Sequence, residues 1–443
     1  MKGLRTLGVL VVLLGALGAY LYYVDAGKPV GETEDKPKVF AVEADQIEEL
    51  TVSTIAGGEA ELKKTADGWS LIRPSQVRAD ESEVSGITSN LATVTILRVV
   101  DENPSNLGDY GLREPVAEVR FKVKGATGFK ALQLGTKTPT GSDMYAKTPD
   151  DKKVFLVSGY LESTFARSPF DLRDKKIISF DREKVDRLEI RHGQSLVSLV
   201  KANGEWRMTA PVSARGDFSA IEGLISKMQS AQMKAIVTED PAQFSKYGID
   251  PPAARVTVVS GSATAAMAFG SKTPDNFIHV RDESKPLVVT APADLFDEVE
   301  KGPIEYRRKD LFEFRAFNLD KIEITRDAAT TVFERLKGKG KDGADAWQNA
   351  TSKKAVDAAK FEAFLTTLSG TRAQSFADEK TKTGLDAPAV TVKATFDGGK
   401  KGETVTIGRV AAEVFGGRSD EPGAARLDAT QLDETLKALD AFK

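Results

Sequence analysis

The sequence predicts an α+β protein made of three tandem copies of a mostly antiparallel β-sheet module with two helices each, behind one N-terminal transmembrane helix. Three observations support this fold class. An uncharged apolar run lies near the N-terminus, three tryptophans recur at nearly constant spacing, and a Gly-x-x-x-Pro pattern recurs in phase with them. A pattern that returns at a fixed period indicates a repeated structural unit.

The predicted anchor is Leu7–Val24, a run of 18 residues without a charge. As a helix it would span roughly 27 Å, close to the hydrocarbon thickness of about 30 Å. Lys2 and Arg5 precede the run, so the positive-inside tendency predicts a cytoplasmic N-terminus and the rest of the chain across the membrane. A cleaved signal peptide, with a small-residue site at residues 16–19, is the alternative. Both interpretations deliver the same region to the same side.

The repeats are defined by three sequence marks. The chain's three tryptophans recur 137 and 141 residues apart, at Trp69, Trp206 and Trp347. A Gly-[Leu/Ile]-x-x-Pro mark recurs at intervals of 137 and 136 residues, starting at Gly111, Gly248 and Gly384. The third mark, [Leu/Phe]-Gly-x-Lys-Thr-Pro, is present around Gly135 and Gly270, whereas the third copy retains only Ile407, Gly408 and Arg409. Together these marks predict triplication.

The marks divide the chain into five predicted parts. A polar stretch with Gly and Pro follows the anchor and is typical of a flexible tether. A Gly/Lys insertion at residues 337–341 indicates a solvent loop in the third copy. The predicted parts are a transmembrane anchor at 1–25, a linker at 26–37, module 1 at 38–178, module 2 at 179–316 and a diverged module 3 at 317–443.

The first half of a module is predicted as three strands and a helix. In copy one the strands are 47–52, 61–65 and 69–72, with Asp67-Gly68 as the turn of a hairpin. Apolar residues at helical spacing then predict an amphipathic helix in every copy. These residues are Val84, Ile87, Leu91 and Val94 in copy one, Phe218, Ile221, Leu224, Ile225 and Met228 in copy two, and Phe361, Phe364, Leu365 and Leu368 in copy three.

The second half is predicted as four strands and a closing helix. The glycine of the Gly-[Leu/Ile]-x-x-Pro mark is expected to supply a positive φ, and its proline to precede a strand. In copy one the strands are predicted at 117–123, 130–135, 144–147 and 154–157, and the helix around 160–165. The third copy is expected to end within a helix at 431–442. Short hairpin-linked strands beside helices indicate an α+β module.

Composition excludes several classes of function. The 62 basic and 65 acidic residues nearly balance, whereas a general nucleic-acid binder needs excess positive charge. The absence of cysteine excludes disulfides, thiol catalysis and Cys-type metal sites. The two histidines, His192 and His279, lack metal-ligand spacing and are not repeated in the other copies. No catalytic, cofactor-binding or metal-binding residue is therefore predicted.

Other features have a structural and a functional interpretation. Gly-Thr-Lys-Thr at 135–138 and Gly-Ser-Lys-Thr at 270–273 suggest a P-loop, but they lack its first glycine and following helix, which favours a hairpin loop. The acidic pairs at 101–102 and 239–240 are interpreted as caps in solvated loops, or else as a protein-contact patch. The basic segment 307–309 is expected to pair with acids of the neighbouring module, or to contact an acidic partner.

The marks resemble a bacterial family called domain of unknown function 4340. Copy two carries Asn203-Gly204-Glu205-Trp206, and copy one carries Tyr110-Gly111-Leu112 with Pro115. The resemblance extends from about Met1 to Phe314, while the third copy lacks the Tyr and the Lys-Thr-Pro. It implies an envelope protein of the bacterial inner membrane with its repeats in the periplasm or outside. It also implies an association with ABC-2-type permeases and gliding-motility-type auxiliary proteins, and it supplies no catalytic residue.

Two functions follow as hypotheses. The first is a non-enzymatic, membrane-anchored accessory, scaffold or binding subunit of an ABC-2-type transport or gliding-motility-like system. Its expected partners are a permease or an auxiliary envelope protein, with membrane contact through the N-terminal helix and no nucleic acid. The alternative is an envelope glycan- or lipid-processing enzyme, which in its glycosidase form needs two carboxylates roughly 5–9.5 Å apart in a cleft.

Overall fold

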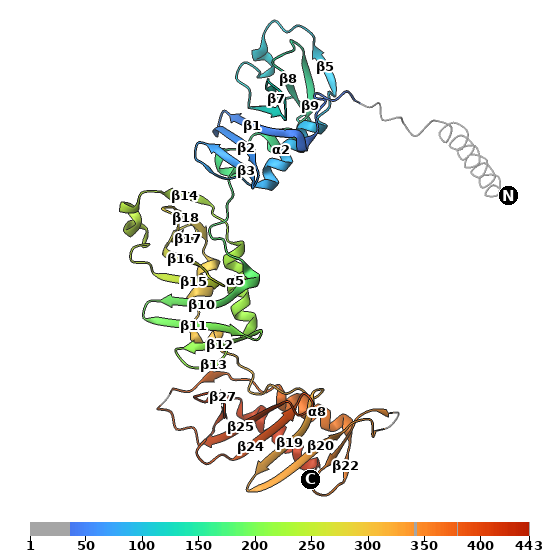
Figure 1. Ribbon diagram of the computed structural model, residues 1–443, viewed down its shortest axis with the longest axis vertical. Coiled ribbons are helices and arrows are strands. Elements are labelled where there is room, and N and C mark those ends of the chain that lie inside the picture. Colours follow the sequence, from blue (N-terminus) through green and yellow to red (C-terminus); the bar gives the residue numbers. More distant parts are fainter. Residues whose placement is uncertain (1–35, 341–342, 379, 443) are drawn as a thin grey trace, which may run out of the picture. The chain divides into compact units, whose positions relative to one another are not determined.

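A computed structural model of the protein describes residues 36–340, 343–378 and 380–442. Over these ranges the chain forms three successive antiparallel sheets of nine strands, one in each predicted copy (Figure 1). The three-copy antiparallel architecture is therefore confirmed. The expected anchor at Leu7–Val24 lies outside the described residues. Within the part that is described, no helix is both long and apolar enough to cross a bilayer.

Module 1 has a sheet with the strand order β4-β3-β2-β1-β6-β7-β8-β9-β5. Its strands are β1 (Ile47–Thr54), β2 (Gly58–Thr65), β3 (Gly68–Arg73), β4 (Val77–Arg78), β5 (Arg98–Asp101), β6 (Ala117–Val123), β7 (Lys130–Lys137), β8 (Asp143–Lys147) and β9 (Val154–Ser158). Its helices are α2 (Glu81–Thr93), α3 (Leu161–Phe165) and α4 (Pro169–Leu172), with the 3-10 helix η3 (Leu107–Tyr110) before β6.

Module 2 repeats this order as β13-β12-β11-β10-β15-β16-β17-β18-β14. Its strands are β10 (Val185–His192), β11 (Ser195–Ala202), β12 (Glu205–Ala210), β13 (Ala214–Arg215), β14 (Ala235–Thr238), β15 (Ala254–Ser260), β16 (Ala263–Lys272), β17 (Phe277–Asp282) and β18 (Val288–Pro292). Its helices are α5 (Phe218–Ser230), α6 (Asp294–Glu300) and α7 (Pro303–Tyr306), and the 3-10 helix η5 spans Pro241–Tyr247.

Module 3 has the same order, β22-β21-β20-β19-β24-β25-β26-β27-β23. Its strands are β19 (Leu319–Arg326), β20 (Ala329–Leu336), β21 (Ala346–Asn349), β22 (Ala355–Val356), β23 (Ser375–Phe376), β24 (Val390–Phe396), β25 (Lys401–Val410), β26 (Glu413–Arg418) and β27 (Ala425–Leu427). Its helices are α8 (Ala358–Ser369) and α9 (Ala429–Ala438), and the 3-10 helix η7 spans Leu439–Phe442.

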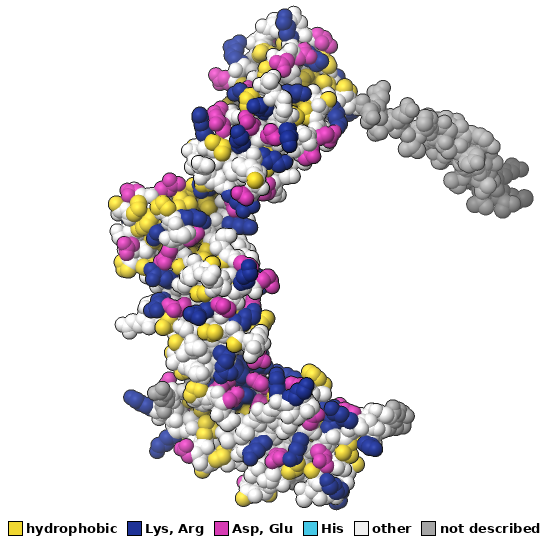
Figure 2. All heavy atoms as spheres, in the orientation of Figure 1, with side chains coloured by type: hydrophobic (Ala, Val, Ile, Leu, Met, Phe, Trp, Pro, Cys, Tyr) yellow, Lys and Arg dark blue, Asp and Glu magenta, His cyan; other side chains and the backbone are white. Residues whose placement is uncertain are grey.

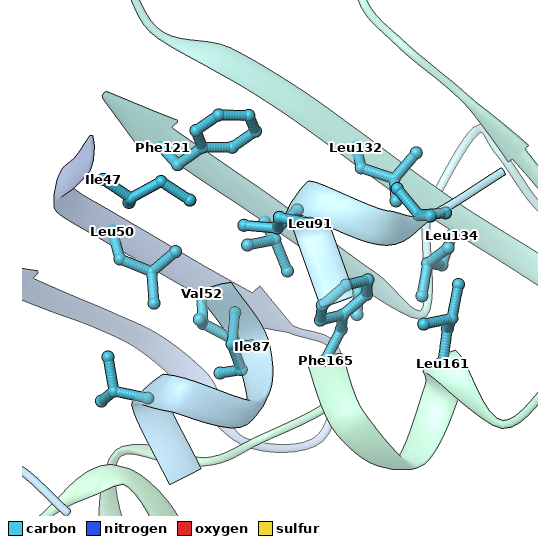
Figure 3. Packing of buried hydrophobic residues seen from close by; sticks show 14 of the residues in the cluster. Ile47, Leu50, Val52, Ile87, Leu91, Phe121, Leu132, Leu134, Leu161 and Phe165 are labelled. Atoms are coloured by element: carbon cyan, nitrogen blue, oxygen red, sulfur yellow. The ribbon is translucent and has the colours of Figure 1, made fainter. Parts of the chain in front are cut away.

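The core of module 1 lies between the sheet and its helices. Leu50 on β1 pairs with Leu62 on β2 and with Phe121 on β6. Because side chains alternate across a strand, these residues share the inner face. Ile87 and Leu91 of α2 point toward that face (Figure 3). All five are at most 2% exposed, and each buried aliphatic side chain contributes about 1.5–3 kcal/mol.

An aspartate caps the first long helix of every module. Asp80 accepts hydrogen bonds from the Ser82 and Glu83 amides at the start of α2. Asp217 at α5 and Asp357 at α8 each accept one from a backbone amide in the same way. Such a cap contributes about 1 kcal/mol, because it satisfies an otherwise unpaired amide. The same residue type therefore starts the same helix three times.

The structure corrects two expectations about helices. Phe218, assigned to the apolar face of its helix, is 55% exposed. It is the first residue of α5, and the Lys201 Nζ lies 5.7 Å from the centre of its ring. Modules 1 and 2 also contain a third helix, α4 and α7, instead of two each. These helices have four residues and start with a proline, so they are too short for an apolar period.

The described chain divides into two compact units, one ending at Lys175 and one spanning Lys176–Lys443. The second unit holds modules 2 and 3, joined by a short connector. Arg307 of this connector bridges Gly216 in module 2, and three residues later Asp310 bridges Arg372 in module 3. The connector therefore pairs with both modules, with only two residues between the two bridges.

Candidate functional site

The two glycine marks come together in all three modules. A Cβ atom added to Gly135 would lie 2.0 Å from the carbonyl oxygen of Tyr110, next to Gly111. The corresponding distances are 2.1 Å from Gly270 to the Tyr247 oxygen and 2.3 Å from Gly408 to the Thr383 oxygen. No side chain fits in so small a space. Both marks therefore serve one close backbone contact, which the sequence pattern does not reveal.

The glycines that open the Gly-[Leu/Ile]-x-x-Pro mark also have the predicted backbone conformation. The φ angles of Gly111, Gly248 and Gly384 are +67°, +69° and +69°. In modules 1 and 2 this glycine ends the 3-10 helix η3 or η5, and its amide donates to carbonyls of that helix. The expected positive φ is confirmed in every copy. It turns the chain toward the next strand.

The cation of the third mark is paired with the closing helix of its own module. Lys137 lies 2.5 Å from a carboxylate oxygen of Glu162 in α3. Lys272 lies 3.3 Å from Asp297 and 3.0 Å from Glu300 in α6. Module 3 has Val410 at this position, and the neighbouring Arg409 pairs with Asp433 in α9. The two lysines therefore connect the sheet to the closing helix through ion pairs. This agrees with the hairpin interpretation and not with a P-loop.

Asp101 of the first acidic pair binds Tyr110, the residue before Gly111. The Tyr110 hydroxyl donates to Asp101 at 3.0 Å, and this hydrogen bond raises the pKa of Tyr110. Asp101 also accepts from the amide of Asn103 at 2.9 Å. Asp240 of the second pair caps η5 by accepting from the Ala242 amide at 3.0 Å. Asp240 is therefore a helix cap, as the sequence predicts for these pairs, whereas Asp101 stabilises the turn after β5 and holds Tyr110.

Both histidines lie against aromatic rings in module 2. The ring of His279 on β17 lies 5.0 Å from that of Tyr247. Its Nδ1 is 2.8 Å from the carbonyl oxygen of Ser271, so this nitrogen donates the hydrogen bond. His192 is the last residue of β10, and its ring lies 5.8 Å from that of Phe296. In the described chain no three His, Cys, Asp or Glu residues are grouped to hold a metal ion.

A cluster of buried charges lies between modules 2 and 3. Arg215 at the end of β13 donates to Glu421 in the β26–β27 loop, and also to the Asp310 carbonyl at 2.7 Å. Arg307 of the connector donates to Glu421 at 3.4 Å and stacks on Phe376, 3.8 Å from its ring centre. Burial lowers the pKa of Arg307, and the Glu421 carboxylate opposes that effect. The predicted pairing of the basic segment with the neighbouring module is confirmed for Arg307.

A second ion pair supports this loop from within module 3. Arg418 donates to Glu403, and their side chains are 5% and 2% exposed. Glu403 also accepts from the backbone amides of Glu313 and Phe314, both at 2.9 Å. Burial alone would lower the pKa of Arg418, but hydrogen bonds to Asp420 and Glu403 raise it. Its partners fix the position of the loop that carries Glu421.

Sequence reasoning singled out Arg307 but missed Arg215, Glu403, Arg418 and Glu421, because the partners are far apart in the chain and follow no common period. One signal was available. The strand pairs Ser70–Arg78, Arg207–Arg215 and Gln348–Ala355 occupy the same place in the three modules. An arginine thus occupies this position in modules 1 and 2, which another module follows, and alanine occupies it in module 3. Elsewhere on the surface both charge signs are interspersed, as Figure 2 shows for one face.

Comparison with known proteins gives one family. A family model described as "Domain of unknown function (DUF4340)" matches residues 69–205 and 206–388. Each match begins at a repeat tryptophan, Trp69 or Trp206, and the second match starts directly after the first ends. Together they cover well over half of the chain. No curated protein and no solved structure matches the chain significantly.

Proposed function

The chain belongs to the DUF4340 family, and from this premise we propose that it is a non-enzymatic, membrane-anchored envelope protein. In this proposal it is an accessory, scaffold or binding subunit of an ABC-2-type transport or gliding-motility-like system. Its partner is a permease or an auxiliary envelope protein. The anchor is Leu7–Val24, with the N-terminus in the cytoplasm and the modules in the periplasm or outside.

The observation that carries this proposal is how the repeated residues are used. The repeated glycines make the close contacts, the repeated cations pair with the closing helix, and the repeated tryptophans are at most 6% exposed. The residues that the sequence repeats are thus those that hold each module together. Tandem frameworks extend a surface and multiply weak contacts, which is the typical physical basis of a scaffold.

The joint between modules 2 and 3 also supports a scaffold. A scaffold is effective when its contact surfaces keep a fixed spacing, because a partner then loses less entropy on binding. Arg215, Arg307 and Glu421 provide buried ion pairs at this joint. Opening it would leave charges buried without partners, which is costly. Module 3 has Ala355 at the position of Arg215.

The location can be tested with the chain's lack of cysteine. Ser262 is an exposed residue in the β15–β16 turn, so Ser262→Cys introduces a single accessible thiol. A membrane-impermeant maleimide should label this thiol in intact spheroplasts. A second variant, Lys2→Cys, should be labelled only after lysis. Labelling of Ser262→Cys only after lysis would contradict the proposed orientation.

The partner can be tested by affinity purification of the full chain in mild detergent. We expect a permease or auxiliary envelope protein to be recovered in stoichiometric amounts. The matched comparison is Glu421→Arg, which places like charges at the joint but leaves the anchor intact. It should reduce recovery if a fixed joint is needed. Recovery of no membrane protein with the unaltered chain would count against the proposal.

The enzymatic alternative depends on carboxylates that are free to react. It requires two carboxylates free to exchange protons with a substrate. The deeply buried Glu403 and Glu421 instead accept hydrogen bonds from arginines, and Glu403 also accepts from two amides. Release of sugars or acyl groups from envelope material by the purified chain would restore this alternative.

A further inference from the structure

One hairpin of module 1 differs from its counterparts in modules 2 and 3. The turn between β6 and β7 spans residues 124–129 and reads Lys-Gly-Ala-Thr-Gly-Phe. The corresponding turn of module 2 is Gly261-Ser262, and that of module 3 is residues 397–400, Asp-Gly-Gly-Lys. The flanking strands pair in the same way in all three modules. The longer turn of module 1 is therefore not required by the fold.

The extra residues give this hairpin an exposed aromatic ring surrounded by cations. Phe129 is 44% exposed. The Arg120 guanidinium carbon lies 5.3 Å from its ring centre, and the Lys122 Nζ lies 5.9 Å from it. Lys124 and Lys130 flank the turn and are exposed. Neither turn of the other modules contains an aromatic residue.

These cations are largely without acidic partners. Lys122 reaches Glu49 at 4.0 Å, but Glu49 is shared with Lys63. Over the residues that the structure describes, Arg120, Lys124 and Lys130 form no ion pair. The hairpin therefore presents positive charge together with an apolar ring. This combination suits the boundary between lipid headgroups and acyl chains.

The hairpin lies beside the start of the described chain. A groove of about 650 Å³ is lined by Ala126 and Lys130 of the hairpin and by Lys38 and Val42. Lys38 lies two residues after the first described position. Residues 25–35 connect this point to the end of the predicted anchor. Because a chain spans at most about 3.6 Å per residue, the predicted anchor ends within about 40 Å of this point, so the hairpin can reach the membrane surface.

We propose that the β6–β7 hairpin of module 1 contacts anionic phospholipid headgroups of the membrane that holds the anchor. Phe129 enters the headgroup region, while Arg120, Lys124 and Lys130 face the lipid phosphates. Each such cation near an anionic surface adds to the attraction, within a Debye length of about 8 Å. This inference rests on the membrane anchor of the proposed function.

The test uses the full chain reconstituted in bilayers and the substitution Phe129→Trp. The native tryptophans are 6%, 3% and 0% exposed, so an exposed indole at position 129 can be distinguished from them. Brominated phosphatidylglycerol in the bilayer should quench Trp fluorescence beyond the level of the unaltered chain. Ser262→Trp, in the short turn of module 2, is the matched control and should add no quenching. Lys124→Gln and Lys130→Gln should each weaken the contact about fivefold at low salt.

The outcomes separate this inference from the proposed function. Two results together support the lipid contact. The extra quenching of Phe129→Trp should be weaker when the only brominated lipid is phosphatidylcholine. It should also be weaker when Lys124→Gln or Lys130→Gln is added to Phe129→Trp. No extra quenching, or equal quenching in both lipids, overturns it. A carbonate wash of the same bilayers tests the anchor separately. Protein that stays in the bilayer without extra quenching refutes only the hairpin contact, whereas protein that is washed out refutes the anchor as well.

Discussion

Arg215 and Glu421 are 206 residues apart in the sequence, yet their side chains form an ion pair. The side chains are only 7% and 4% exposed. Arg307 reaches the same carboxylate, so one glutamate of module 3 pairs with two arginines, one from module 2 and one from the connector. This carboxylate therefore holds much of the stability of the joint.

Replacing Glu421 by Gln should open the joint. Arg307 would lose its carboxylate partner and Arg215 would keep only Glu313, at 3.5 Å, and breaking a buried pair costs about 3–5 kcal/mol. Hydrogen exchange measured by mass spectrometry should show faster exchange in the connector and in the β26–β27 loop. Glu305→Gln, which removes a more exposed pair with Lys309, should cost at most about 1 kcal/mol. Equal effects of the two substitutions would show that the joint does not depend on Glu421.

Replacing Gly270 by Ala should destabilise module 2. Its Cβ would lie 2.1 Å from the Tyr247 carbonyl oxygen, a backbone atom that cannot move away alone. Overpacking of this kind costs about 3 kcal/mol, measured as the free energy of unfolding in urea. The control is Gly223→Ala in the exposed middle of α5, where no atom lies within 4 Å. That change should stabilise by about 0.5–1 kcal/mol. A neutral Gly270→Ala would refute the close contact.

The stability of module 2 should depend on pH through Glu222. Burial would raise the pKa of Glu222, but hydrogen bonds from Lys201 and Trp206 outweigh it and lower the pKa. A lowered pKa in the folded state stabilises the protein above the unfolded pKa of about 4.3, and this contribution is lost as the pH falls through the folded value.

Glu222→Gln tests this dependence. The stability difference between the unaltered chain and the variant should be largest near about pH 7 and shrink toward about pH 3. Urea unfolding followed by tryptophan fluorescence measures it. Glu205→Gln, an exposed residue of the same module, serves as the control. A difference that stays constant over this pH range would show that Glu222 is not held ionised by its partners.

Replacing Lys272 by Met should have a small, salt-dependent effect. The lysine pairs with Asp297 and Glu300, but its side chain is 43% exposed, so the solvent screens the pair. The loss of stability should be smaller at about 1 M salt than at about 0.05 M. The P-loop interpretation predicts otherwise. It would require that magnesium-ATP raise the melting temperature of the unaltered chain and not of the variant.

Much of the fold follows from local pattern. The alternation of Leu50 and Val52 predicts β1, and Val84, Ile87 and Leu91 predict α2, because one buried face imposes a period on the sequence. The positive φ at Gly111 was likewise predicted from the residue type, because glycine adopts this conformation without strain. Such features depend on a few neighbouring residues. The exposed Phe218 is an exception, because the spacing of apolar residues does not show at which residue a helix begins.

The sequence by itself determined that the chain holds three copies of one antiparallel module, because a repeated pattern records a repeated environment. It also showed that the glycines, the tryptophans and the two lysines recur at corresponding positions of the copies. Only the tertiary structure decided that Gly135 meets Tyr110 and that Arg215 meets Glu421. The physical reason is that these contacts join segments distant in the chain. Their geometry depends on how the sheet pairs and how the connector holds its modules, which no local period encodes.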